Sequence, residues 1–389
     1  MAKYKLDDLC EFITDGTHQT PEYCEEGGVI FLSSKDVTER KINWDDVKHI
    51  PDSLHEKLYK RLSPQKNDIL LAKNGTTGVA AIVDRDEIFD IYVSLAVLRP
   101  IKSIYPKYLL YAINSPVAKR QFDAGLKGIG VPNLHLGVIR ETVINVAERE
   151  EQELICETLD KVAGIIDKRK AELNALDDLI KARFVEMFGD VTTGNYKYKT
   201  CKLGDVANIG SSHRVFTTEF VEKGIPFYRG TEIGELANGI KPTDPYYIAE
   251  EHYNRLINGG NKPQIGDLLM PSICNKGQVW MVDTEEPFYY KDGRVLCVSA
   301  DRQIFNTKYL EYFMRVKTLV EYPKLGSGST FAEFKIFLLK DIDVLIPPIE
   351  LQNQFAGFVR VVDKSKVAVQ KALDETQLLF DSLMQEYFG

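Results

Sequence analysis

The chain has 389 residues, of which 44% are hydrophobic, a formal net charge of −8 at pH 7 and six cysteines. This length and apolar content allow two substantial cores, whereas widely spaced cysteines without a CxxC motif exclude a disulfide-rich domain and argue against a zinc site. Because neither an apolar leader behind basic residues nor a run of 18 apolar residues occurs, we expect a cytoplasmic protein without membrane contact.

The first half of the chain predicts a mixed α/β domain followed by a long helix. Turn residues separate its short β-rich runs, as in a sheet with close connections. In chain order we predict strands in 68–75, 78–84 and 92–100, a helix at 107–114, a long helix over 150–189 and a linker over 190–200.

The second half repeats this plan. Strands are predicted in 267–283 and 294–300, a helix at 308–315 and a second long helix over 350–389. Pro347 and Pro348 favour a helix start, and Gly189 favours a helix end. The matching positions are Leu6 and Leu203, Asp8 and Asp205, Asp68 and Asp267, Tyr108 and Tyr309, Gln152 and Gln352, and Phe188 and Phe388. We therefore predict four segments: a globular domain (1–149), a long helix (150–189), a linker with a second globular domain (190–349) and a second long helix (350–389).

Both long helices carry a heptad pattern of apolar residues, which predicts that they pack against each other. At 1.5 Å per residue, nearly 40 residues in register span about 55 to 60 Å, more than one small domain can cover. The expected fold class is α+β: two mixed α/β domains joined by two helices in an antiparallel coiled coil, with a pseudo-twofold internal repeat. The predicted seam is Ile155, Leu159, Val162, Ile166, Leu173, Leu176 and Ile180 with Phe355, Val359, Val362, Val369, Leu373 and Phe380; Arg169, Lys366 and Thr376 occupy its remaining positions.

The acidity of the chain is confined to these helices. Residues 150–190 hold 6 Lys and Arg against 11 Asp and Glu, and residues 350–389 hold 4 against 6. The remaining residues are close to neutral, so charge alone does not favour a nucleic-acid partner.

Catalytic motifs are missing from the sequence. There is no GxxxxGK[ST] phosphate loop, HExxH, GxSxG or glycine-rich dinucleotide loop, and the six histidines are scattered. We therefore expect neither catalysis nor a bound metal or cofactor in this chain.

Polar, glycine-containing loops recur at corresponding places in the two halves. DGTHQTP from Asp15 corresponds to GSSHRVF from Gly210, and AKNGTTG from Ala72 corresponds to PSICNKG from Pro271. Their Asn, Gln, Arg, Lys, Ser and Thr side chains are the types that pair with base edges and phosphates. A single loop of this kind is more often an ordinary turn, but its recurrence in both halves favours recognition.

At this point the sequence resembles the specificity subunits of type I restriction-modification enzymes over essentially its whole length. The resemblance is carried by KLDDLCEFITDGTH with KLGDVANIGSSHR, by NDILLAKNGTTG with GDLLMPSICNKG, and by VINVAEREEQELICETLDKVAGIIDKRKAEL with VLIPPIELQNQFAGFVRVVDKSKVAV. It implies that each domain reads one half of a split double-stranded DNA site and that the helices set the spacer. It also implies two methyltransferase subunits using S-adenosylmethionine, two ATP- and Mg-dependent restriction subunits, and a bacterial or archaeal cytoplasm.

The candidate DNA-binding residues are chosen by loop position and side-chain chemistry. Lys35, Lys73, Arg214 and Arg229 are predicted to contact guanine or phosphate, and Gln19, Asn74 and Asn275 to contact adenine. The complete set is Thr17, His18, Gln19, Ser34, Lys35, Lys73, Asn74, Thr76, Asn133 and His135 in the first domain, and Ser212, His213, Arg214, Arg229, Thr231, Asn275, Lys276, Ser329 and Thr330 in the second.

Two other interpretations remain open. The chain could direct a different methyltransferase or nuclease to DNA, which the missing catalytic motifs fit equally well. It could instead be a tandem protein-binding scaffold without a nucleic-acid role, which the acidic composition favours slightly.

Overall fold

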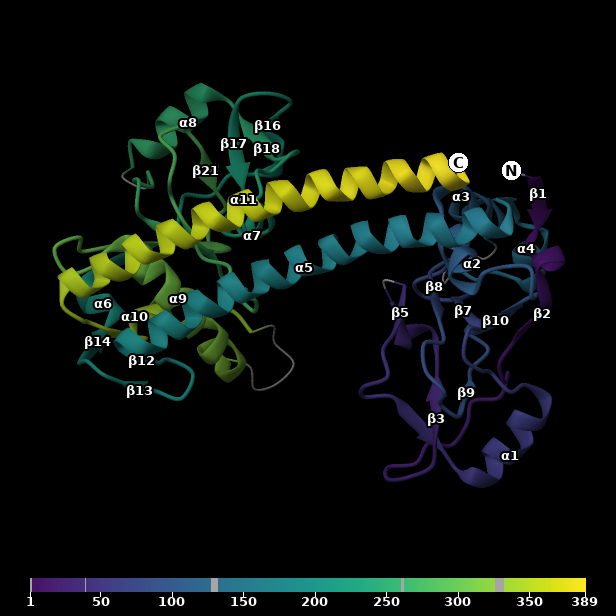
Figure 1. The fold of residues 1–389 in the computed structure, drawn as a ribbon. Helices are drawn as coiled ribbons and strands as arrows, with labels where there is room; N and C mark the ends of the chain where they lie inside the picture. Colours follow the sequence, from purple (N-terminus) through teal and green to yellow (C-terminus); the bar gives the residue numbers. More distant parts are fainter. Residues whose placement is uncertain (1, 39, 127–131, 260–261, 326–331) are drawn as a thin grey trace. The chain divides into compact units, whose positions relative to one another are not determined.

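The computed structural model describes residues 2–38, 40–126, 132–259, 262–325 and 332–389. These residues form two compact units: the first combines Met1–Ala171 with Val369–Gly389, and the second is Glu172–Ala368. Each long helix therefore contributes one part to each unit (Figure 1). Among the described residues, no helix is both long and apolar enough to cross a membrane.

The first unit contains mostly antiparallel strands around a mixed α/β core. Its strands are β1 (Ala2–Lys5), β2 (Cys10–Asp15), β3 (Val29–Leu32), β4 (Val37–Thr38), β5 (Lys41–Ile42), β6 (Lys48–Ile50), β7 (Ile69–Ala72), β8 (Ala80–Ile82), β9 (Phe89–Ile91), β10 (Leu95–Pro100) and β11 (Val143–Val146). Its helices are the 3-10 helices η1 (Leu6–Leu9) and η2 (Ser34–Asp36), α1 (Asp52–Arg61), α2 (Pro106–Ile113), α3 (Pro116–Gly125), α4 (Leu136–Glu141) and parts of α5 (Arg149–Phe188) and α11 (Ile349–Phe388). The main sheet has the order β2-β10-β7-β8, beside a β6-β3-β9 sheet and the pairs β1-β11 and β4-β5.

The second unit has a closely related topology. Its strands are β12 (Gly189–Asp190), β13 (Asn195–Tyr196), β14 (Thr200–Lys202), β15 (Ala207–Gly210), β16 (Phe220–Val221), β17 (Ile225–Tyr228), β18 (Tyr246–Ile248), β19 (Leu268–Pro271), β20 (Trp280–Met281), β21 (Tyr289–Tyr290), β22 (Val295–Ala300) and β23 (Asp343–Leu345). Its helices are α6 (Leu203–Val206), η3 (Thr217–Glu219), α7 (Gly230–Ala237), α8 (Glu250–Ile257), α9 (Thr307–Glu321), η4 (Tyr322–Leu325), α10 (Ile336–Lys340) and the other parts of α5 and α11. Its sheets are β15-β22-β19-β20, β16-β18-β17-β21, β14-β23 and β12-β13.

The sheet order confirms the internal repeat and the mixed α/β character of both domains. In both main sheets a long strand, β10 or β22, pairs on one side with the strand that follows the first helical turn, β2 or β15, and on the other with a fully buried strand, β7 or β19. In both smaller sheets one strand, β3 or β17, has an antiparallel and a parallel neighbour. The strands and helices predicted from periodicity occur at the expected places. The strands are shorter than predicted, α9 is longer, and α2, α5 and α11 are shifted by one residue.

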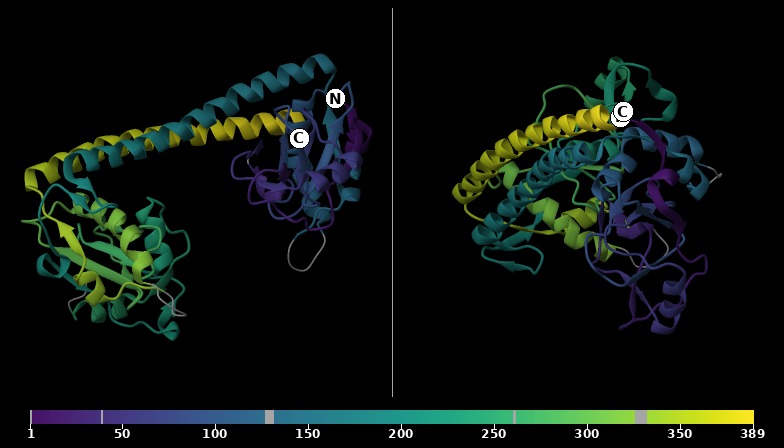
Figure 2. Two further views of the ribbon diagram at one scale, coloured as in Figure 1. Left: turned by 90° about the horizontal axis from the view of Figure 1, so that it is seen from below. Right: turned by 45° about the vertical axis from the view of Figure 1, so that its right-hand side comes forward.

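The two long helices run antiparallel inside each unit. In the first unit, the initial turns of α5 share a core with the final turns of α11, and in the second unit the end of α5 shares a core with the start of α11 (Figures 1 and 2). Most seam residues are buried: Ile155, Leu159, Val162, Ile166, Ile180, Phe355, Val359, Val362 and Phe380. Leu173, Leu176, Val369 and Leu373 are only half-buried. The seam also extends to Phe184, Phe188, Met384 and Phe388, which the predicted seam omitted.

A buried glutamine ties the start of each long helix to its domain. The Gln152 side chain accepts a hydrogen bond from the Tyr105 amide at 2.8 Å and donates to the Ala147 carbonyl at 2.9 Å. Gln352 accepts from the Asn306 amide at 2.9 Å and donates to the Pro347 carbonyl at 2.8 Å. Because both side-chain groups are satisfied, each glutamine can be buried at little cost and fixes where its helix leaves the domain.

Helix α5 ends at Gly189, as predicted. Gly189 has a φ of +96°, and a Cβ there would lie 2.2 Å from the Asn195 carbonyl oxygen. Only glycine fits both requirements. The predicted linker folds back at this point as the short hairpin β12-β13.

Candidate nucleic-acid interface

In the first unit, several candidate residues converge on the segment 92–94 between β9 and β10. Thr17 forms a parallel bridge with Tyr92, the Ser34 amide donates to the Ser94 hydroxyl at 3.0 Å, and the Lys73 amide donates to the Ser94 carbonyl at 2.8 Å. Residues from three distant parts of the sequence are thus held at one edge of the main sheet. The hydrogen bonds are made by backbone groups, so most of the side chains stay available.

A hollow of about 510 Å³ opens at this edge. Asn74 and Asn133 form an antiparallel bridge across it, and the Leu134 amide donates to the Lys73 carbonyl at 2.9 Å. The lining residues are Asp15, His18, Lys73, Asn74, Val93, Asn133, His135, Leu136 and Gly137. Five of the ten candidates of the first domain therefore surround one hollow. Sequence reasoning missed Asp15 as a member, although it begins the first polar loop.

The floor of this hollow is a buried ion pair. The Lys73 ammonium donates to an Asp15 carboxylate oxygen, and the two side chains are 7% and 10% exposed. His18, on the exposed side, contacts the other Asp15 oxygen at 3.3 Å. The charge of Lys73 is already paired with a carboxylate of the protein, so this side chain helps to form the floor of the hollow. Direct contact of its ammonium with a phosphate remains a prediction.

The remaining candidates of the first domain lie around the hollow or away from it. Gln19 is exposed beside Thr17, and Lys35 is exposed with its ammonium 3.7 Å from Asp36. Thr76 lines a separate hollow beside Phe380 of α11. The DNA contacts of these residues remain predictions, because the structure neither groups the residues around the hollow nor excludes the contacts.

Helix α1 is a part of this surface that the sequence analysis did not identify. The Arg61 guanidinium donates to the Asp15 carbonyl at 2.9 Å, which places the basic end of α1 against the first loop. Lys57, Lys60 and Arg61 are exposed, and among the described residues none of the three forms an ion pair. Two features of the sequence could have indicated α1: a helix start after Pro51 and basic residues in the last turn of the helix.

In the second unit, the equivalent loops meet at the ends of β17, β19 and β21. The Ser212 hydroxyl donates to the Tyr290 carbonyl at 2.6 Å, and the His213 amide donates to the Tyr289 hydroxyl at 2.9 Å. Gly230, at the start of α7, packs against Pro271 at the end of β19. Arg214, Thr231, Asn275 and Lys276 are exposed around these contacts. Ser329 and Thr330 lie outside the described residues.

Arg229 is bound within its own helix turn. Its guanidinium donates to Glu232 and lies 4.5 Å from the centre of the Tyr246 ring. Burial alone would raise the pKa of Glu232, but the guanidinium and backbone amides outweigh it, so the pKa of this carboxyl lies below its ordinary value. Arg229 is thus held in one orientation at the start of α7, and its predicted contact with DNA would have to use the part of the guanidinium that Glu232 leaves free.

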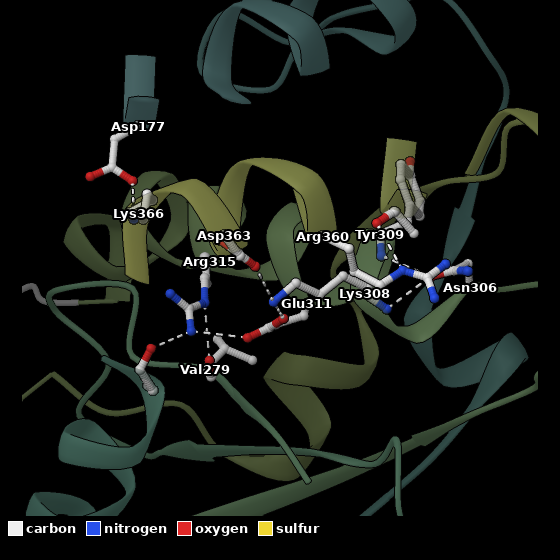
Figure 3. A network of polar contacts seen from close by, with 12 residues as sticks. Asp177, Val279, Asn306, Lys308, Tyr309, Glu311, Arg315, Arg360, Asp363 and Lys366 are labelled. Carbon is white, nitrogen blue, oxygen red and sulfur yellow. Dashed lines mark hydrogen bonds and ion pairs between the residues drawn. The ribbon is translucent and has the colours of Figure 1, made fainter. Parts of the chain in front are cut away.

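A polar network fixes α7 and α11 to α9 behind these loops (Figure 3). Glu311 of α9 is buried and pairs with Lys308 and Arg315, both at 2.9 Å. Arg315 donates in turn to the carbonyls of Ala237, at the end of α7, and Val279, and Lys308 lies 3.6 Å from Asp363 of α11. The candidate helix α7 is therefore anchored at the end opposite to Arg229.

The described residues contain no group of three or more His, Cys, Asp or Glu residues arranged to hold a metal ion. All six cysteines are free, and burial raises the pKa of Cys10, Cys156 and Cys297 to about 12 and that of Cys274 to about 11. These thiols stay protonated at neutral pH and are poor nucleophiles.

Comparison with known proteins agrees with the resemblance seen in the sequence. Residues 1–176 match the family described as "Type I restriction modification DNA specificity domain". Two proteins of Methanocaldococcus jannaschii are similar. The provisionally named MjaX specificity subunit of a type I restriction enzyme is 22% identical over 307 residues, covering 72% of this chain and 68% of the relative. The type I restriction enzyme MjaVIII specificity subunit is 25% identical over 179 residues, covering 44% and 42%.

Two solved structures share the fold. The S subunit of a type I restriction-modification system from M. genitalium has a TM-score of 0.55 at 15% identity, with 100% of this chain and 96% of that chain covered. A chain from a study of complex assembly and conformational transition of the type I R-M system has a TM-score of 0.56 at 17% identity, with 99% and 97% covered.

Proposed function

We propose that this chain, a member of the specificity-subunit family of type I restriction-modification systems, reads a two-part DNA site with one half for each recognition domain. The observation that carries the proposal is the repeated cluster of polar loops, held by hydrogen bonds at the same edge of the main sheet in both units. Rigid loops with free amide, imidazole and hydroxyl groups suit the reading of base edges. The candidate residues above remain the proposed contacts.

The long helices are proposed to set the distance between the two half-sites. Their antiparallel packing within each unit and their buried glutamine anchors support a rigid spacer. We further propose that the chain positions two methyltransferase subunits, which use S-adenosylmethionine to methylate adenine, and two restriction subunits, which use ATP and Mg, in the cytoplasm of a bacterium or archaeon. The proposed domain bounds are 1–149, 150–189, 190–349 and 350–389.

Recovery of the tagged chain from its own host tests this function. The retained DNA is sequenced and the bound proteins are identified by mass. We expect a DNA motif in two parts separated by a fixed unread spacer, together with an adenine methyltransferase. Bound proteins without an enriched DNA motif would instead support the scaffold interpretation and remove the candidate contacts.

The exposed basic end of α1 is expected to add phosphate contacts to the first half-site. Each phosphate neutralised by a lysine contributes about 0.9 to the slope of log K against log salt concentration. Replacing Lys57 and Lys60 by alanine should therefore reduce this slope by up to about 1.8 and weaken all sequences alike, measured by titration of the intact complex with DNA at several salt concentrations.

The matched control replaces two lysines that are equally exposed but distant from the loops. Lys102 follows the end of β10 opposite to the Asp15 contact, and Lys3 lies on β1. Their double alanine variant should keep the slope of the unmodified protein. Equal slopes for both variants would show that α1 does not contact phosphate.

A further inference from the structure

The loops after β7 and β19 occupy equivalent positions in the two units. The Lys73 carbonyl accepts a hydrogen bond from the Leu134 amide at 2.9 Å, and the Ser272 carbonyl accepts one from the Phe334 amide at 2.7 Å. Each contact joins the end of a fully buried strand to the segment that precedes a short helix, α4 or α10. Residues that follow these contacts can therefore be compared one by one.

The register of the two short helices is the same. Ile139 of α4 and Leu339 of α10 are both fully buried, and the amide of each donates to the carbonyl of the residue that precedes its helix. This register pairs Gly137 with Phe337. It also pairs Leu136 with Ile336, and the loops after the strands pair Asn74 with Ile273.

The buried ion pair of the first unit has no counterpart in the second. Ile13 and Ile209 occupy equivalent positions of the two main sheets. One residue of β10 pairs with both Ile13 and Ile69, and one residue of β22 pairs in the same way with both Ile209 and Leu268. Two residues further, Asp15 corresponds to Ser211. The Asp15–Lys73 pair is thus replaced by two serines, of which Ser272 has a buried hydroxyl without a hydrogen-bond partner in the described residues.

At two of these three positions the second unit carries a larger apolar side chain: Ile273 stands in place of Asn74, and Phe337 in place of Gly137, whereas Leu136 and Ile336 are apolar in both units. Asn74, Leu136 and Gly137 line the hollow of the first unit, and Ile273, Ile336 and Phe337 are 38%, 37% and 64% exposed in the second. A Cβ at Gly137 would meet no atom within 4 Å, so this position faces open space. An aromatic ring as exposed as that of Phe337 is costly to leave in water unless a partner covers it.

From this difference we infer that Phe337, with Ile273 and Ile336, contacts the 5-methyl group of a thymine in the half-site read by the second domain. The inference rests on the proposed function. The thymine methyl is the apolar group that base pairs present in the major groove, and apolar side chains are its usual partners. The candidate loops meet beside these residues. The Ser272 amide donates to the Arg294 carbonyl, the Ser211 hydroxyl donates to the Val295 carbonyl, and Gly230 packs against Pro271. DNA is therefore the occupant that the neighbouring polar side chains fit. The first domain has Asn74 and Gly137 at the equivalent positions and so offers no apolar ring there.

Replacement of thymine by deoxyuridine removes this methyl group and nothing else. Each thymine of the site recovered with the complex is replaced in turn, and affinity is measured for the intact complex. We expect a loss of about fourfold at one or two thymines of the second half-site, which corresponds to about 0.8 kcal/mol for a buried methyl-sized group. Phe337→Gly, which copies the first domain, should abolish the preference for thymine over uracil at those positions.

Two controls isolate the contact. Ile240→Ala removes another exposed apolar side chain of the second unit and should leave the thymine preference unchanged. Thymines of the first half-site should respond to deoxyuridine equally with and without Phe337.

An affinity that no deoxyuridine lowers, or a thymine preference that survives in Phe337→Gly, would overturn the assignment. A uniform loss of affinity in Phe337→Gly, or a loss of a protein partner alone, would overturn it too and would identify the patch as a wedge or a docking surface. If the unmodified complex retains no sequence-specific DNA, the proposed function itself fails.

Discussion

Replacement of Asp15 by alanine is expected to lower the free energy of unfolding of the first unit by about 3 to 5 kcal/mol, because Lys73 is then left buried without a counter-charge. The pair is almost fully buried, and the other Asp15 oxygen holds His18 at the rim of the hollow. The loss of the carboxylate therefore removes both the charge balance and the local order of the first polar loop.

This expectation can be measured separately for each unit. The chain has two tryptophans, Trp44 in the first unit and Trp280 in the second. In a Trp280→Phe background, urea unfolding followed by fluorescence reports on Trp44, which packs against Phe89.

Two further variants test the cause of the destabilisation. Asp15→Ala combined with Lys73→Met should recover most of the loss, because an apolar pair of similar volume removes the uncompensated charge. Ser211→Ala, at the equivalent position of the second unit, breaks only uncharged hydrogen bonds and should cost about 1 kcal/mol. A double variant as unstable as the single one would show that the Asp15–Lys73 pair is not what stabilises the loop.

Replacement of Phe355 by alanine is expected to destabilise the second unit by about 3 to 5 kcal/mol, the usual range for deletion of a buried aromatic ring. Phe355 is fully buried at the start of α11. Its ring centre lies 5.3 Å from that of Phe184 and 5.6 Å from that of Phe188, both at the end of α5, and 5.3 Å from that of Tyr312 in α9. One ring therefore joins both long helices to the domain.

The readout for this variant is Trp280 fluorescence in a Trp44→Phe background during urea unfolding. Val361→Ala on the same helix is the matched control, because Val361 is 65% exposed and its truncation should change the unfolding free energy by less than about 0.5 kcal/mol. A Phe355 variant as stable as this control would contradict a shared aromatic core between α5, α9 and α11.

Part of the candidate interface follows from the sequence alone. The polar loops at Asp15, Ala72, Gly210 and Pro271 were predicted to correspond, and the structure places each pair at the same edge of its main sheet. The individual contacts remain predictions. Lys73 and Arg229 were predicted to contact guanine or phosphate, and in the structure both are also paired with carboxylates of the chain, Asp15 and Glu232.

Other features of the interface had no local signal. Helix α1 joins the first loop through a single hydrogen bond between Arg61 and the Asp15 carbonyl, which are 46 residues apart in the chain. The exposure of Phe337 also could not be predicted, since apolar residues in a short helix more often face the core. The proposed role of Phe337 follows only from the comparison with Gly137, which occupies the equivalent position of the first unit.

By itself, the sequence determined the internal repeat, the two long helices with their apolar seam, and the resemblance to a family. These features follow from local sequence patterns: heptad spacing, glycine and proline at helix ends, and motifs that occur twice. Only the tertiary structure decided which polar side chains pair with other groups of the protein and which face outward. This difference depends on pairs of residues that are distant in the sequence. Asp15 and Lys73 are 58 residues apart and meet only after the sheet has formed. Their burial follows from the packing around them.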